Sequence, residues 1–129
     1  MQLSTTLAMA AAAAIINLWL GMRIGRIRHA EKISVGDGGN DLLTRRMRAQ
    51  LNFAENTPLF LILVGGIELA GKGGVWLAPV AGVFMLGRVA HAIGMDGKLQ
   101  AGRMFGALSA MIGMLGLAVV AVLISLGKF

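Results

Sequence analysis

The chain has 129 residues, of which 57% are hydrophobic and only 14% charged, and its formal net charge is +6. Soluble domains carry about a quarter charged residues, so a soluble fold of this length could not hide so much apolar surface, and the mean hydropathy of +0.76 agrees. The absence of cysteine excludes disulfides and Cys-bound metal centres. Two His and six carboxylates leave little material for a metal site, and we expect none.

The net positive charge raises the question of a nucleic-acid partner. The basic residues cluster beside hydrophobic segments and lack the interleaved aromatic residues of nucleic-acid surfaces. Membrane topology explains their placement more simply, because basic residues accumulate in cytoplasmic connections. We therefore expect membrane lipids, and no nucleic acid, as partners.

The hydrophobic pattern predicts an all-α fold, an integral membrane four-helix bundle forming one domain over residues 1–129. The expected helices cover about residues 3–28, 41–69, 75–95 and 99–126. The first apolar run, Leu3 to Met22, has the length of roughly 20 residues that a spanning helix needs. No Lys or Arg precedes this run, so we interpret it as a retained helix and not as a signal peptide.

The connections are short and rich in glycine. Gly36-Asp37-Gly38-Gly39 predicts a turn, since it lacks the Lys-Ser/Thr pair and the preceding strand of a phosphate-binding loop. Asp41 is placed to cap the second helix, and Pro58 should kink it. The pairs Gly21/Gly25 and Ser109/Gly113 permit close approach of helix backbones.

The distribution of basic residues predicts the orientation. The first connection and its flanks are strongly basic, the third connection holds Lys98 and Arg103, the second holds only Lys72, and the N-terminus holds none. The positive-inside rule then places both termini outside the cytoplasm. A bacterial inner membrane is the expected location.

Polar side chains form a stripe on the second helix. Arg45, Arg48, Asn52 and Glu55 are spaced by three, four and three residues, which places them on one helical face. A carboxylate in hydrocarbon must protonate, find a partner or line a wet cavity. Two interpretations stay open for this stripe: an internal hydrogen-bonded strut, or a site for a zwitterionic ligand.

The third and fourth helices add polar groups at a similar depth. Arg88 and His91 share a face of the third helix, and Arg103 begins the fourth. His91 is either a structural hydrogen-bonding group or a ligand contact. Arginines bind carboxylates through forked hydrogen bonds, and Glu55 could accept from an ammonium group. A ligand with two carboxylates and one amine would satisfy this set. Glutathione is such a ligand, although the residues alone do not single it out.

Three segments resemble a known family. The segment Arg48-Ala-Gln-Leu-Asn-Phe-Ala-Glu-Asn-Thr-Pro58 resembles the second-helix signature of the MAPEG family, the membrane-associated proteins of eicosanoid and glutathione metabolism. Gly87-Arg-Val-Ala-His91, followed by Gly97-Lys98-Leu99, is similar to the third-helix region of its prostaglandin E synthase members. The Gly36 to Gly39 turn resembles uncharacterised bacterial members, and the likeness covers nearly the whole chain.

The resemblance implies a homotrimer that binds glutathione, as cosubstrate, between protomers near the cytoplasmic face. Carried over by position, the residues that would contact glutathione are Arg26, Arg48, Gln50, Asn52, Glu55, Arg88 and His91. Arg103 matches the family's catalytic arginine near the glutathione sulfur. Eukaryotic members place tyrosines where this chain has Asn56 and Met95.

The chemistry that the resemblance implies depends on Arg103. A nearby cation lowers the thiol pKa from about 8.5 and raises the thiolate fraction. The expected function is a membrane glutathione transferase or peroxidase acting on lipophilic electrophiles or lipid hydroperoxides that arrive from the bilayer. The alternative is a non-catalytic member that binds lipid or a partner protein, with its polar stripe internally paired and no room for a tripeptide. A transporter or channel is disfavoured because the charges crowd one end.

Overall fold

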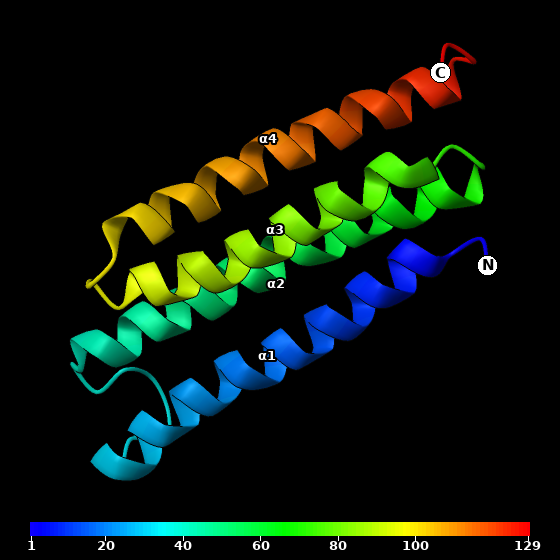
Figure 1. Ribbon diagram of the computed structural model, residues 1–129. Helices are drawn as coiled ribbons and strands as arrows, with labels where there is room; N and C mark the ends of the chain where they lie inside the picture. Colours follow the sequence, from blue (N-terminus) through cyan, green and yellow to red (C-terminus); the bar gives the residue numbers. More distant parts are fainter.

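Four helices account for most of the chain. The computed structural model describes all 129 residues and contains α1 (Ser4–Glu31), α2 (Asp41–Leu69), α3 (Gly74–Met95) and α4 (Gln100–Ser125). Both termini and the α2–α3 turn lie at one end of the bundle, and the α1–α2 connection and the α3–α4 turn lie at the other (Figure 1). We call the latter the basic end. The all-helical, four-helix prediction is confirmed.

The helices α2 and α3 occupy the centre of the protomer. The helix α1 packs on α2 and α3, and α4 packs on α3 and α2, whereas α1 and α4 share no contact. Figure 1 shows α1 and α4 on opposite flanks of the central pair. Polar residues on α2 and α3 can therefore meet inside the protomer, while α1 and α4 present long outer surfaces.

The helix ends follow local chemistry, with two differences from expectation. The helix α1 continues past the expected end at residue 28 to Glu31, where Lys32 adopts a left-handed φ of 55° and its N–H donates to the Arg28 carbonyl. The helix α2 is capped by Asn40, whose side chain accepts from the Leu43 N–H at 2.9 Å. The expected cap, Asp41, instead pairs with Arg45 at 2.8 Å. The prediction was wrong by one residue because Asn is an equally good cap.

Three of the four helices, α1, α3 and α4, are long and apolar enough to cross a membrane. The helix α2 is equally long, with 29 residues, but its first half carries the arginines and Glu55, so its apolar part is shorter than expected. Only 27 of the 129 residues are buried in the protomer. Large apolar side chains on α4, such as Ile112 and Leu115, are about 70% exposed. Such a surface requires lipid or another protomer.

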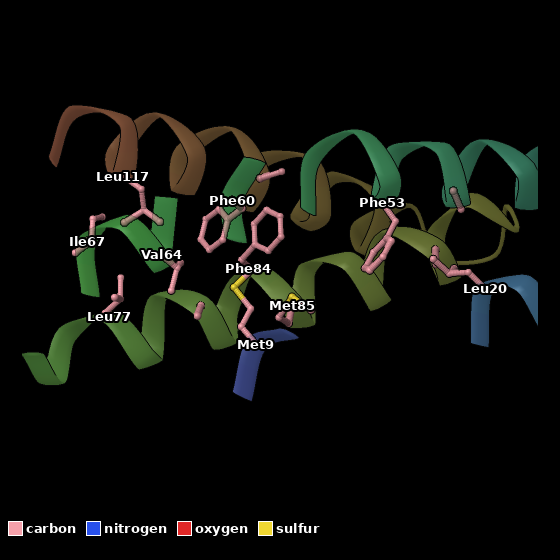
Figure 2. Close-up of a cluster of buried hydrophobic side chains, with 14 of the residues drawn as sticks. Met9, Leu20, Phe53, Phe60, Val64, Ile67, Leu77, Phe84, Met85 and Leu117 are labelled. Carbon is pink, nitrogen blue, oxygen red and sulfur yellow. The ribbon is translucent and has the colours of Figure 1, made fainter. Parts of the chain in front are cut away.

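The hydrophobic core runs along the bundle toward both of its ends. Phe60 of α2 and Phe84 of α3 stack with ring centroids 3.8 Å apart, and Figure 2 shows them at the centre of the buried cluster. The cluster extends in one direction to Val64, Ile67 and Leu77 and in the other to Phe53 and Leu20. Arg88, one turn beyond Phe84, therefore lies beside the core and not past its end.

The contact between α3 and α4 is made by glycines. We call Gly87, Gly94, Gly102 and Gly106 the glycine seam. A Cβ on Gly106 would lie 2.5 Å from the Gly87 carbonyl oxygen, and one on Gly102 would lie 2.7 Å from the Ala90 carbonyl oxygen. No side chain fits at these positions, because the obstacle is backbone. The helices α3 and α4 therefore lie in backbone contact.

The two small-residue pairs expected to pack closely behave differently. Ser109 meets Gly87, and Gly113 lies against the Phe60 ring, where a Cβ would be 3.0 Å from a ring carbon. At the other pair, Gly25 has no neighbouring atom within 4 Å and Gly21 has only the Gln50 amide at 3.9 Å. Within the protomer, α1 therefore does not use its glycines for close packing.

At the terminal end, Glu68 caps α1 from a distance. Its carboxylate accepts from the backbone N–H groups of Thr5 at 3.1 Å and Thr6 at 2.7 Å, and from the Thr6 hydroxyl at 2.6 Å. The helix α1 has no capping side chain of its own. A carboxylate at a helix N-terminus satisfies free N–H groups and complements the helix dipole. Glu68 thus joins the beginning of α1 to the end of α2.

Candidate functional site

Three helices meet in a buried polar cluster, which we define as Asn52, Arg88 and the Gly106 carbonyl. Arg88 of α3 is 2% exposed, and its guanidinium donates to the Asn52 Oδ1 of α2 and to the Gly106 carbonyl of α4. Asn56 donates to the Asn52 carbonyl at 2.8 Å. These bonds join α2, α3 and α4 one turn from the aromatic core. The deeper part of the polar stripe is therefore paired within the protomer.

Arg88 is not fully satisfied by these bonds. Its Nε is buried and has no hydrogen-bond partner in the chain, and the guanidinium lies 5.1 Å from the centre of the Phe84 ring. Buried polar groups are nearly always paired, so an unpaired guanidinium N–H is an unusual feature. One donor of the polar cluster thus lacks a partner within the chain.

His91 lies beside the polar cluster without joining it. The residue is 8% exposed, and its Cβ and Cα pack against Gly106 across the glycine seam. It makes no hydrogen bond within the chain, so the structural hydrogen-bonding interpretation has no partner group to support it. Its backbone position is fixed by the same close contact that holds α3 on α4.

Arg48 and Gln50 line a groove between α1 and α2. This α1–α2 groove has a volume of about 820 Å³, within the range of roughly 300–1,000 Å³ found for small-ligand pockets. Arg28 and Arg48 lie toward its basic end, with Gln50 and Leu51 deeper along α2. The Arg28 guanidinium donates to the Gly36 carbonyl at 2.7 Å, and Arg48 makes no hydrogen bond or ion pair in the chain. The groove combines free positive charge with an apolar wall.

Four of the charged residues expected in the site are exposed on the protomer: Arg26, Arg48, Glu55 and Arg103. None of them makes an ion pair within the chain. Glu55 lies at the middle of α2, on the same face as Arg48 and Asn52. The Arg103 backbone packs on Gly94, where a Cβ would lie 2.8 Å from the Arg103 Cα, so α3 fixes the start of α4.

Within one protomer, the residues expected in the site therefore lie in three separate places. Asn52 and Arg88 come together in the polar cluster with His91 beside it, and Arg48 and Gln50 come together in the α1–α2 groove. Arg26, Glu55 and Arg103 lie on the surface, and no hydrogen bond or ion pair joins Arg103 to Glu55 or Arg48. That all of these residues contact one glutathione stays a prediction.

A second charged assembly lies at the basic end and was not predicted from the sequence. We define the Asp96 cluster as Arg23, Arg46 and Asp96. Asp96, between α3 and α4, accepts from Arg23 of α1 and lies 3.4 Å from Arg46 of α2. Arg23 is 8% exposed and also donates to the Ala92 carbonyl at 3.3 Å. The available signal was that Asp96 is the sole acidic residue in the third connection.

The acidic and imidazole groups are scattered through the protomer. Nowhere in the chain do three or more His, Asp or Glu side chains come close enough to hold a metal ion. The chemistry available to these residues is therefore that of guanidinium, carboxylate and amide groups: binding of anions, of an ammonium group, and stabilisation of developing negative charge.

A comparison with protein families identifies a relationship that covers the four helices. The model of the MAPEG family matches residues 6–123, which is nearly the whole chain. The match confirms the resemblance carried by the second-helix segment from Arg48 to Pro58. No curated protein sequence matches the chain.

Proposed function

Because the chain belongs to the MAPEG family, we propose that it is a membrane-bound glutathione-dependent transferase or peroxidase. Its substrates are lipophilic electrophiles or lipid hydroperoxides. The family includes glutathione transferases and peroxidases, and the three apolar spans support an integral membrane protein. The active assembly is a homotrimer in a bacterial inner membrane, with both termini outside the cytoplasm and glutathione bound between protomers near the basic end.

The observation that carries the proposal is the exposure of Glu55 and Arg48. Both lie on one face of α2 and neither has an ion-pair partner within the protomer. An ionised carboxylate halfway along a helix of a membrane protein is too costly to leave against lipid. A neighbouring protomer together with a zwitterionic ligand would supply both missing partners. Contact between protomers would also cover the exposed charges of Arg26 and Arg103.

Each residue of the proposed site has a chemical task. Arg26, Arg48 and Arg88 bind the two glutathione carboxylates through their guanidinium groups. Glu55 accepts from the ammonium group, and Gln50, Asn52 and His91 contact the peptide. The α1–α2 groove beside Arg48 and Gln50, with its volume of about 820 Å³, supports the proposal because it is large enough for a tripeptide.

Arg103 performs the activation. Its fixed positive charge lowers the pKa of the glutathione thiol, so more thiolate is present at neutral pH. The thiolate then forms a carbon–sulfur bond with an electrophile and displaces its leaving group. With a hydroperoxide, two glutathione molecules give the disulfide, an alcohol and water.

The test is calorimetry of glutathione binding to the protein purified in detergent. We expect wild-type protein to bind, Glu55→Gln to lose most of the affinity, and Arg103→Ala to bind without the ultraviolet absorbance of the thiolate. Absence of binding at millimolar glutathione, in protein shown to be trimeric, would overturn the proposal.

One observation favours the second candidate, a non-catalytic member that binds lipid or a partner protein. Asn52 and Arg88 bond to each other and to Gly106, as expected for a structural strut. The same calorimetry separates the two, because the scaffold gives no heat with glutathione and no dependence on Glu55.

A further inference from the structure

We propose that Asp96 is a positioning residue for Arg103: through Arg23 and Arg46 it holds the beginning of α4 against α1 and α2. This inference rests on the proposed function, because Arg103 is the residue placed next to the glutathione sulfur. The proposal concerns the distance between the two halves of the site, the ligand-binding face of α2 and the thiolate-stabilising charge on α4.

Asp96 lies at the junction of α3 and α4 in the chain. Asp96 follows the last residue of α3, and the turn after it leads directly into α4, which begins at Gln100. Its two carboxylate oxygens are divided between two helices: Oδ2 accepts from Arg23, and Oδ1 faces Arg46 at 3.4 Å. A single side chain thus connects the α3–α4 turn to both α1 and α2.

Further contacts make this attachment rigid. Arg46 NH1 donates to the Arg23 carbonyl at 3.1 Å, so the two arginines are also joined to each other. The Arg23 guanidinium lies 4.8 Å from the centre of the Trp19 ring. Arg45 reaches the Met95 carbonyl at 3.5 Å. Side chains from α1 and α2 thus hold the last residues of α3 in place through polar contacts.

The position of Arg103 depends on two independent attachments. The glycine seam fixes Arg103 against α3, since the Arg103 backbone packs on Gly94. The seam leaves the distance from α4 to the Arg48–Glu55 face of α2 undetermined at the basic end. Asp96 supplies this restraint, while the bond between Asn52 and Arg88 supplies the corresponding restraint deeper in the bundle.

Electrostatics explain why the α3–α4 turn would detach from α1 and α2 without the Asp96 carboxylate. The Arg23 and Arg46 side chains are 10% and 21% exposed, and Asp96 is the carboxylate that each contacts. Removing one partner of a partly buried ion pair leaves an uncompensated charge. In Asp96→Asn the two guanidiniums would repel each other and turn toward water, and the α3–α4 turn would move away from α2.

The experiment measures the thiol pKa of bound glutathione, from the pH dependence of thiolate absorbance, together with the glutathione Kd. We expect Asp96→Asn to raise the bound thiol pKa by about one unit, which is roughly a tenfold loss of thiolate at neutral pH. The Kd should change less than about threefold, because the α2 ligands remain. Asp96→Glu should restore most of the shift, since it keeps the charge.

The matched control is Asp41→Asn. Asp41 pairs with Arg45 at the same end of the bundle, within one helix and 83% exposed. The substitution removes the same charge and one ion pair but breaks no link between helices, so the thiol pKa should stay at the wild-type value. Arg46→Gln keeps the Arg23–Asp96 pair and is a milder second variant, with an expected rise of about half a unit.

A distance measurement tests the geometry without glutathione. The chain has no cysteine, so spin labels can be attached cleanly through Leu51→Cys on α2 and Met104→Cys on α4, both exposed positions. Asp96→Asn should broaden the distribution of distances between the labels, and Asp41→Asn should leave it unchanged.

The outcomes distinguish this inference from the proposed function. Wild-type protein that does not bind glutathione overturns both. Wild-type protein that binds it with a lowered thiol pKa, while Asp96→Asn shows the same pKa and the same label distances, overturns the positioning role alone. An equal rise of the thiol pKa in Asp41→Asn would also overturn it, because the effect would then be one of general charge.

Discussion

The helix α3 is attached to its two sides by different physical means. Its contact with α4 is the glycine seam, in which backbone meets backbone and no volume is left. Its contacts with α1 and α2 toward the basic end combine apolar packing with hydrogen bonds and ion pairs made by long side chains, those of the polar cluster and the Asp96 cluster. The first attachment requires that the glycines carry no side chain. The second requires the charged side chains of the polar cluster and the Asp96 cluster.

This difference indicates where the protein tolerates substitution. Packed interiors resist added volume, so the glycine seam behaves as one rigid unit. Arginine side chains can reorient at small cost, so the side of α2 that carries Arg48 can adapt to a ligand or a neighbouring protomer. The proposed ligand contacts on α2, among them Arg48 and Glu55, are thus placed next to a rigid pair of helices.

The largest effect is expected at the glycine seam. Gly106→Ala should lower the free energy of unfolding by about 3 kcal/mol, because the new methyl group meets the Gly87 carbonyl and the backbone of His91. Gly116→Ala in the same helix has no atom within 4 Å and should be neutral or stabilising by less than about 1 kcal/mol. Denaturant titration in detergent, followed by tryptophan fluorescence, measures both. Equal effects would mean that the seam is not close-packed.

The next largest effect is expected at the polar cluster. Asn52→Ala removes the side-chain acceptor of Arg88, and we expect a loss of about 2 kcal/mol in the same titration, together with weaker glutathione binding. Glu55→Gln on the same face should change the unfolding free energy by less than about 0.5 kcal/mol and still abolish binding. An Asn52→Ala protein of wild-type stability would show that the strut contributes nothing.

A smaller effect is expected in the α1–α2 groove. Leu51 is 56% exposed, so Leu51→Ala should change the unfolding free energy by less than about 0.5 kcal/mol. Leu77, which is fully buried in the core, provides the comparison, since Leu77→Ala should cost about 3 kcal/mol. Thermal unfolding in detergent compares the two, and a large loss in Leu51→Ala would mean that another protomer covers the groove.

The smallest effect is expected in the α1–α2 connection. The backbone N–H of Gly39 and the Thr44 hydroxyl donate hydrogen bonds to Asp37 and hold its pKa below the ordinary value of 3.8. A carboxyl whose folded pKa is lowered stabilises the fold above its unfolded pKa and loses that contribution as pH falls through the folded pKa. Protection of the Gly39 amide against hydrogen exchange should therefore be constant above pH 3.8 and decrease below it. In Asp37→Asn, protection should show no such decrease.

The sequence predicted the features that depend on spacing along one helix. The four helices follow from runs of apolar residues, and the polar stripe of the second helix follows from the spacing of its residues by three and four. The open choice between a strut and a ligand site is answered differently for different residues. Asn52 is part of a strut, whereas Glu55 and Arg48 remain unpaired within the chain.

The features that the sequence did not predict depend on the rotation and register of helices relative to each other. From the sequence, Gly102 and Gly106 could not be recognised as more closely packed than Gly116 and Gly25. Only their contact with α3 in the structure shows this difference. Asp96 looked like an ordinary turn residue, because nothing local shows that Arg23 and Arg46 reach it. Glu68 could not be recognised as a cap, since the helix that it caps begins more than 60 residues earlier.

The cap formed by Glu68 has a consequence for biosynthesis. Thr6 precedes its carboxylate partner by 62 residues, so the first turn of α1 leaves the ribosome long before the group that completes it. During synthesis those amides must rely on water or lipid headgroups at the membrane surface. The N-terminal turn can therefore acquire this cap only after the end of α2 has been synthesised and has come beside the beginning of α1.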